Sequence, residues 1–180
     1  VFIPEKSILS QREVWHDTWS FVNALRSAMR EDPNVIFVWE IRDKETADAV
    51  LSLSETWHLV FSTLHTPSAA GTVNRFISFF PPEIQDSVAS RLSDTLLSVL
   101  SQFLVKNNDG KSRVAIYELM LNSLAVRNNI VKRQILQIDN VIETNNSNGM
   151  ISMKQYAQRL VDKWIVTEDS VWFIMGNLVS

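Results

Sequence analysis

Three polar residues stand where a run of apolar residues ends, and their types suit phosphate chemistry. Glu40, Arg42 and Asp43 follow the β-prone run Val35–Val38. Such a run predicts a strand that is buried on both faces and delivers a carboxylate to the carboxyl edge of a sheet, where ligands bind. An acid fixed there can hold a magnesium ion or orient an attacking water. Glu40 is the foremost candidate, although a capping Asp43 with a surface ion pair explains the same residues equally well.

Two histidines accompany the next predicted strand, His58–Leu64. His58 and His65 are seven residues apart, so an extended strand would point them to opposite faces and they should not share a metal. His65, beside Thr63 and Thr66, could donate a hydrogen bond to a terminal phosphate. A histidine near a strand end is more often structural, so the spacing alone does not settle its role.

The elements around these residues predict a βαβ unit. Helical periodicity over Ser20–Met29, with Asp17 or Thr18 as its cap, precedes the strand Val35–Glu40. Asp43 can cap the helix that leads into the second strand. The two strands should therefore be parallel, with a right-handed crossover.

Two helices are predicted downstream of the histidines. Thr66 followed by Pro67 indicates a helix start, with the threonine as N-cap and the proline in the first turn. Glu83 opens a longer helix whose apolar residues continue on one face to Leu104.

A hairpin and a helical segment complete the chain. Arg113–Leu121 predicts a strand whose partner is Gln102–Val105. The remaining helices are predicted over Ser123–Val131, Arg133–Glu143, Ser152–Lys163 and from Glu168 onward. We therefore expect an α/β core over residues 1–121 and a small all-α subdomain over residues 122–180.

Composition excludes several classes of protein. The chain has 180 residues, of which 46% are hydrophobic, enough for one domain and a small appendage. Its net charge of -3 and the scatter of its basic residues argue against nucleic acid as a partner. The absence of cysteine excludes disulfides and thiolate metal sites. No membrane-spanning run or signal-peptide pattern is present, so we expect a cytoplasmic protein.

Several segments, in order, resemble one family. Ala24–Asp43 is similar to the Walker B region of the type II secretion and type IV pilus motor ATPases, and Ser54–Thr66 is similar to their His box. Further matching segments are Gln11–Val14, Asn74–Phe76, Phe80–Glu83 and Ala125–Asn128. The resemblance implies the C-terminal part of a RecA-like P-loop NTPase core, with a mostly parallel sheet and helices on both faces, followed by the all-α subdomain.

The resemblance also implies roles for single residues. Glu40 corresponds to the Walker B acid, which acts on magnesium through bound water, His65 lies near the terminal phosphate, and His58 opens the His box. These three are the implied catalytic residues, and ATP and Mg²⁺ are the implied cofactors. The residues implied to contact the nucleotide are Glu40, Arg42, Asp43, Thr63 and His65.

The branch of the family that the chain resembles is pilus retraction. Ala125–Asn128 is similar to a helical motif of that branch, and Arg127 would serve motor output. The interval Gln102–Arg113 lacks the four-cysteine zinc element frequent in the assembly and secretion branch. The resemblance implies a homo-hexameric ATPase at the inner face of the cytoplasmic membrane, held there only through partners, chiefly an inner-membrane pilus platform protein. The alternatives are a pilus-assembly or type II secretion ATPase and a catalytically dead ring subunit.

One motif of the family is missing from the chain. No Gly-x-x-x-x-Gly-Lys-Ser/Thr sequence occurs in it, so the loop whose backbone amides cradle phosphate is not part of it. That loop and the family's Asp box would lie before Val1. We therefore expect a fragment that does not hydrolyse ATP by itself.

Four tryptophans stand where the family pattern has glycine: Trp15, Trp39, Trp57 and Trp164. Four independent losses of glycine in one chain are improbable. Our hypothesis is that the source organism reads UGA as glycine and that the sequence was translated with UGA as tryptophan. If the tryptophans are real, we expect overpacking and strain near Trp39 and Trp57.

Overall fold

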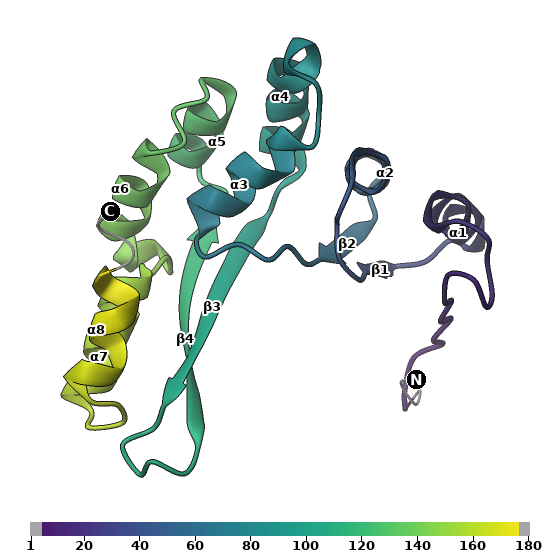
Figure 1. The fold of residues 1–180 in the computed structure, drawn as a ribbon. Coiled ribbons are helices and arrows are strands. Elements are labelled where there is room, and N and C mark those ends of the chain that lie inside the picture. The colour runs from purple at the N-terminus through teal and green to yellow at the C-terminus, as the bar shows by residue number, and fades with distance from the viewer. Residues whose placement is uncertain (1–4, 177–180) are drawn as a thin grey trace. The chain divides into compact units, whose positions relative to one another are not determined.

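The computed structural model describes residues 5–176, and its contacts divide the chain into two compact units, Val1–Leu64 and His65–Ser180 (Figure 1). This division differs from the boundary predicted after Leu121. The reason is that the hairpin expected to belong to the α/β core packs with the helices that follow it, so that hairpin and helices share one unit.

The first unit is the predicted βαβ unit. Its elements are α1 (Phe21–Ala28), the short 3₁₀ helix η1 (Met29–Glu31), β1 (Val35–Val38), α2 (Lys44–Glu55) and β2 (Leu59–Ser62). The strands β1 and β2 pair in parallel, with Val35 opposite Leu59 and Val38 opposite Ser62. The parallel arrangement predicted from the sequence is therefore confirmed, although β2 ends two residues before the predicted Leu64.

Strand β1 is buried on one face only. Ile36 and Val38 are buried, whereas Val35 and Phe37 are each 54% exposed. A single crossover helix covers one face of a two-stranded parallel sheet and leaves the other uncovered. The prediction that this strand is buried on both faces is therefore wrong for the described chain.

The helix starts of this unit are set by side-chain caps. The hydroxyl of Ser20 accepts a hydrogen bond from the backbone N–H of Asn23. Ser20 is therefore the cap of α1, and the prediction of Asp17 or Thr18 is wrong. Asp43 caps α2 as predicted, because its Oδ1 accepts from the N–H of Thr46 at 2.8 Å. A cap of this kind stabilises a helix by about 1 kcal/mol.

The second unit is built on a long antiparallel hairpin. Its strands, β3 (Ser98–Lys106) and β4 (Arg113–Leu121), have nine residues each and pair in full register. The hairpin prediction is confirmed, but the helix predicted to run from Glu83 to Leu104 is wrong. The helix ends at Thr95 because Leu96 is extended, and the residues beyond it join the sheet, where cross-strand pairing replaces helical hydrogen bonds.

Helices α3, α7 and α8 contact this hairpin, and Figure 1 shows α7 and α8 alongside it. The elements are α3 (Ala69–Ser78), η2 (Pro82–Ile84), α4 (Gln85–Thr95), α5 (Leu124–Val131), α6 (Gln137–Thr144), η3 (Asn146–Asn148), α7 (Met153–Asp162) and α8 (Glu168–Gly176). The predicted helical segments are confirmed over the described residues, except that α6 begins four residues late. Arg133, where its start was predicted, has a left-handed φ of 57° that interrupts the helical path. Positions 177–180, which the last predicted helical segment also covers, lie outside the described residues.

The start of α3 also differs from the prediction. Ser68 is its N-cap, with its hydroxyl accepting from the N–H of Gly71 at 3.0 Å. The hydroxyl of Thr66, the predicted cap, is bonded to that of Thr72 at 2.6 Å. Pro67 therefore precedes the cap and does not occupy the first helical position.

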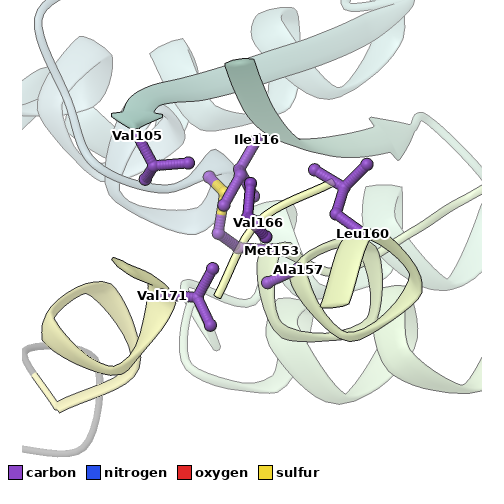
Figure 2. Packing of buried hydrophobic residues seen from close by; sticks show 7 residues of the cluster. All are labelled: Val105, Ile116, Met153, Ala157, Leu160, Val166 and Val171. Carbon is purple, nitrogen blue, oxygen red and sulfur yellow. The ribbon is translucent and has the colours of Figure 1, made fainter. Parts of the chain in front are cut away.

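A compact apolar cluster joins the hairpin to the last two helices. Figure 2 shows its seven residues, contributed by both strands, by α7, by the segment after it and by α8: Val105, Ile116, Met153, Ala157, Leu160, Val166 and Val171. Ile116 is fully buried. The cluster fixes the C-terminal helices on the hairpin.

Candidate nucleotide site

The ends of β1 and β2 meet at one edge of the first unit. The backbone N–H of Ile41 donates to the carbonyl of Thr63 at 3.0 Å. The hydroxyl of Ser62 donates to the carbonyl of Val38 at 3.0 Å. Glu40 and Thr63 therefore lie at the same carboxyl edge of a parallel sheet, which is where such sheets bind ligands.

Glu40 is held at this edge in an unusual backbone conformation. Its φ is 66°, in the left-handed region that is uncommon for residues other than glycine. Its side chain is 13% exposed, and its Oε2 accepts from Nη2 of Arg42 at 2.5 Å. Through that hydrogen bond, the carboxylate raises the pKa of the Arg42 guanidinium. Left-handed conformations of this kind cluster at functional sites.

Asp43 has a structural task at the same edge. Its carboxylate accepts the N–H of Thr46 and so satisfies one of the first amides of α2. The capping interpretation of Asp43 is thus confirmed, whereas a direct contact with nucleotide stays a prediction.

The two histidines are placed differently from Glu40. His58 precedes β2, with Nδ1 at 3.0 Å from the hydroxyl of Thr56. It therefore lies at the amino end of a strand whose four residues span about 13 Å, and the structure does not bring it together with Glu40. His65 is the first residue of the second unit, and its side chain is exposed.

The edge suits a magnesium ion that is held mainly through water. Among residues 5–176, no group of three or more His, Cys, Asp or Glu side chains could hold a metal. Glu40 supplies one carboxylate, a hard oxygen ligand. Magnesium typically binds one or two carboxylates and substrate phosphates and keeps several waters. One acid at the edge therefore fits the ion when nucleotide completes its shell.

Three of the four tryptophans that the resemblance places at family glycines have a backbone conformation suited to glycine. Trp15, Trp57 and Trp164 have φ values of 74°, 69° and 56°, a region that glycine adopts without steric cost. Trp39 lacks this feature, and its ring lies beside that of Phe37, with 5.9 Å between centroids. All four indoles are exposed, Trp57 at 98%. The expected overpacking is therefore wrong at both Trp39 and Trp57, and backbone strain is found at Trp57 but not at Trp39.

Sequence reasoning missed one buried acid. Glu118 lies on β4 with its side chain enclosed. The available signal was a single carboxylate inside the otherwise apolar stretch Ala115–Leu121.

Arg127, assigned to motor output by resemblance, lies exposed on α5. None of the described helices is both long and apolar enough to cross a bilayer.

The fold is that of the secretion and pilus ATPases. The chain matches a structure described as the crystal structure of the pilus retraction motor PilT with bound ADP, at 40% identity and a TM-score of 0.87 over 97% of the chain and 49% of that structure. It also matches the ATPase DotB of Legionella pneumophila, at 26% identity and a TM-score of 0.79 over 93% of the chain and 45% of DotB. The α/β fold class predicted from the sequence is thus confirmed.

The family follows from the sequence match. The model of the type II/IV secretion system protein family matches residues 15–160, and the chain belongs to this family. It is 46% identical to a twitching motility protein of Neisseria gonorrhoeae and 44% identical to the type IV pilus retraction ATPase PilT of Pseudomonas aeruginosa. Each match covers 92% of the chain but only 44% and 48% of the relatives. The chain thus spans about half their length.

Proposed function

We propose that the chain is part of a hexameric ATPase that hydrolyses ATP with Mg²⁺ and drives the retraction of type IV pili. The observation that carries the proposal is Glu40, set beside Thr63 at the carboxyl edge of a parallel sheet. The support from relatives is the identity of 46% and 44% to proteins named for twitching motility and pilus retraction.

The residues at this edge have distinct tasks in the proposed reaction. Glu40 would hold the magnesium ion through its water shell, and Arg42 neutralises the carboxylate through the hydrogen bond described above. The bound ion supplies charge neutralisation on the phosphates. His65 would donate a hydrogen bond to the terminal phosphate. The phosphate loop would come from sequence outside the chain, and the remaining contacts from a neighbouring subunit.

The central experiment is ATP turnover by the natural full-length protein with Glu40→Gln. This change keeps the shape of the side chain and removes its charge, so turnover should fall by about 100-fold or more. Glu45→Gln is the matched control, because Glu45 is an exposed acid in the first turn of α2, and it should retain full activity. Equal activity of wild type and Glu40→Gln would refute the assignment.

The 180-residue chain alone provides a second measurement. Because it has no phosphate loop, we expect no sustained release of phosphate from ATP. Sustained turnover by this chain would show that the missing loop is not needed.

Retraction is favoured over secretion by the extent of the matches. The retraction relatives match over 92% of the chain, whereas the type II secretion protein E of Pseudomonas aeruginosa matches over 48% of it. Cells of the source organism that lack the protein should extend pili but fail to retract them, and labelled pili followed by microscopy test this. Loss of pilus extension instead would favour the assembly function.

The proposed location is the inner face of the cytoplasmic membrane, with an inner-membrane platform protein as the partner. Cell fractionation with crosslinking should recover the protein with that partner from the membrane fraction. Release from the membrane in cells that lack the platform protein would support attachment through the partner alone.

A non-catalytic ring subunit is the second candidate, and the left-handed backbone at Trp57 favours it if the tryptophans are real. The discriminating measurement is ATP binding by the full-length protein with glycine at positions 15, 39, 57 and 164. Binding supports the motor, whereas its absence supports a subunit that fills the ring without turnover.

A further inference from the structure

Glu118 is a buried acid that the proposed reaction does not use. It lies on the inner face of β4, only 7% exposed, opposite the buried Ser101 of β3. Moving a carboxylate out of water is unfavourable unless hydrogen bonds replace the water. An apolar residue would pack at this position without that cost. The reason for an acid at this position must therefore lie in the hydrogen bonds that Glu118 accepts.

Both carboxylate oxygens of Glu118 accept hydrogen bonds from helix starts. Oε1 accepts from the backbone N–H of Ala69 at 2.8 Å, and Oε2 accepts a longer bond from that of Met153 at 3.4 Å. Ala69 is the first residue of α3, and Met153 is the first residue of α7. These two helices are far apart in sequence, and one side chain contacts the beginning of both.

The bonds complete caps that serine side chains leave incomplete. Ser68 accepts from the N–H of Gly71, and Ser152 accepts from that of Gln155. The first amide of each helix has no partner within its helix, and Glu118 accepts a hydrogen bond from each of these two amides. A carboxylate is favoured there because the N-terminal end of a helix carries partial positive charge.

The start of α7 is fixed to the same strand by the backbone. Leu119, which follows Glu118, exchanges two hydrogen bonds with Ile151, at 2.9 Å and 3.1 Å. Ile151 lies two residues before α7 begins. Within residues 5–176, no backbone hydrogen bond of this kind joins the start of α3 to β4, so the hydrogen bond between them comes from the Glu118 side chain.

We infer that Glu118 is a positioning residue, which fixes the start of α3 to β4 and α7 and thereby sets the path of the His65–Thr66 segment that leads into α3. The part of this inference that concerns His65 rests on the proposed function. The anchoring of α3 does not, and it is measurable without any activity.

The pKa of Glu118 reflects both its burial and its two hydrogen bonds. Burial raises the pKa of Glu118, and the N–H groups of Ala69 and Met153 lower it in part. Asp139 and Glu143, both on α6, raise it further. The carboxylate is thus held in an unfavourable setting that the two helix starts partly offset.

The first experiment is hydrogen–deuterium exchange of the natural full-length protein with Glu118→Gln. Glutamine has the same shape but only one acceptor oxygen, so it turns an N–H donor toward one helix start. Exchange over residues 66–72 should become about tenfold faster, because the N–H of Ala69 loses its bond to a charged group whether it then faces the neutral oxygen or the NH2 of glutamine. Glu143→Gln is the control: it removes a nearby exposed charge without removing a bond to either helix start, and should leave exchange unchanged.

The second experiment measures turnover by Glu118→Gln, His65→Ala and the double variant. If Glu118 acts through His65, Glu118→Gln lowers kcat by about tenfold with little change in KM. The double variant should then be no slower than His65→Ala, since the two changes remove one function.

The outcomes separate the two proposals. Unchanged exchange in Glu118→Gln overturns the positioning role, whatever the activity. Faster exchange with fully additive losses of kcat overturns the link to His65. If His65→Ala keeps full turnover, the role proposed for His65 fails, and the exchange result still decides whether Glu118 anchors α3.

Discussion

Glu40 in the first unit and Glu118 in the second have opposite environments. In the first unit, Glu40 lies at an open sheet edge, with the exposed guanidinium of Arg42 as its partner. In the second unit, Glu118 is enclosed, and each of its oxygens accepts a backbone N–H. A carboxylate paired with an exposed, flexible side chain can exchange that partner for a ligand, whereas one bonded to two helix starts holds structure in place. The proposed magnesium ligand Glu40 and the structural anchor Glu118 thus lie in different units.

The units also differ in how they are packed. The first unit has a two-stranded sheet with one face covered, and Phe37 and Phe61 are each 54% exposed. The second has a hairpin of nine-residue strands with fully buried Ile116 and Met120 on its inner face. Buried apolar area is the main stabilising term in folding, so we expect most of the stability of the chain to reside in the second unit.

The largest expected effect is a core truncation in the second unit. Ile116→Ala should lower the free energy of unfolding by about 3 kcal/mol, because it removes a fully buried methylene and two methyl groups and leaves a cavity. Urea unfolding followed by circular dichroism measures this. The matched change in the first unit is Phe37→Ala, which should cost less than about 1 kcal/mol, since the ring is half exposed. Equal losses would contradict the difference between the units.

A smaller effect is expected at the cap of α2. Asp43→Ala should lower stability by about 1 kcal/mol, because the N–H of Thr46 loses its acceptor. Asp43→Asn is the control, since asparagine caps helices about as well. If Asp43 serves only the cap, Asp43→Asn in the full-length protein should also keep ATP turnover. Loss of turnover with retained stability would instead show that its charge contacts the nucleotide.

A gain in stability is expected at Trp57. Trp57→Gly should stabilise the first unit by about 1 kcal/mol, because a left-handed residue other than glycine is strained and its exposed indole contributes little packing. Trp39→Gly is the control without a positive φ and should not stabilise the first unit.

The recoding hypothesis is tested by mass spectrometry of the native protein. Tryptophan-containing peptides at positions 15, 39, 57 and 164 would end it.

The smallest expected effect is a pH dependence in the second unit. Burial raises the pKa of Glu118 above its ordinary 4.5, and partial desolvation together with the charge of Glu143 raises the pKa of Asp139 above its ordinary 3.8. The folded chain therefore binds these protons more tightly than the unfolded chain, so their contribution to stability is present below the ordinary values and is lost as the pH rises to the raised ones. Urea midpoints measured from pH 4 to pH 7 should show this loss, and Glu118→Gln should weaken it. A loss of the same size in Glu118→Gln would assign the dependence to other groups.

The sequence by itself determined the local elements and the position of the acid. The run Val35–Val38 followed by Glu40, with Asp43 as cap, predicted the parallel βαβ unit and the edge residue correctly. These features follow from side-chain periodicity and short-range hydrogen bonding, which lie within a few residues. The family resemblance was equally local, and the matches to relatives confirm it.

The tertiary structure decided what depends on distant partners. Periodicity extended a helix to Leu104, but pairing with β4 makes those residues a strand. Nothing local to Glu118 shows that it joins Ala69 and Met153, which are 49 and 35 residues away. Side-chain patterns indicate which face of an element is apolar. The contacts that cover this face exist only once the chain has folded, and so do the hydrogen bonds between backbone amides and a buried carboxylate.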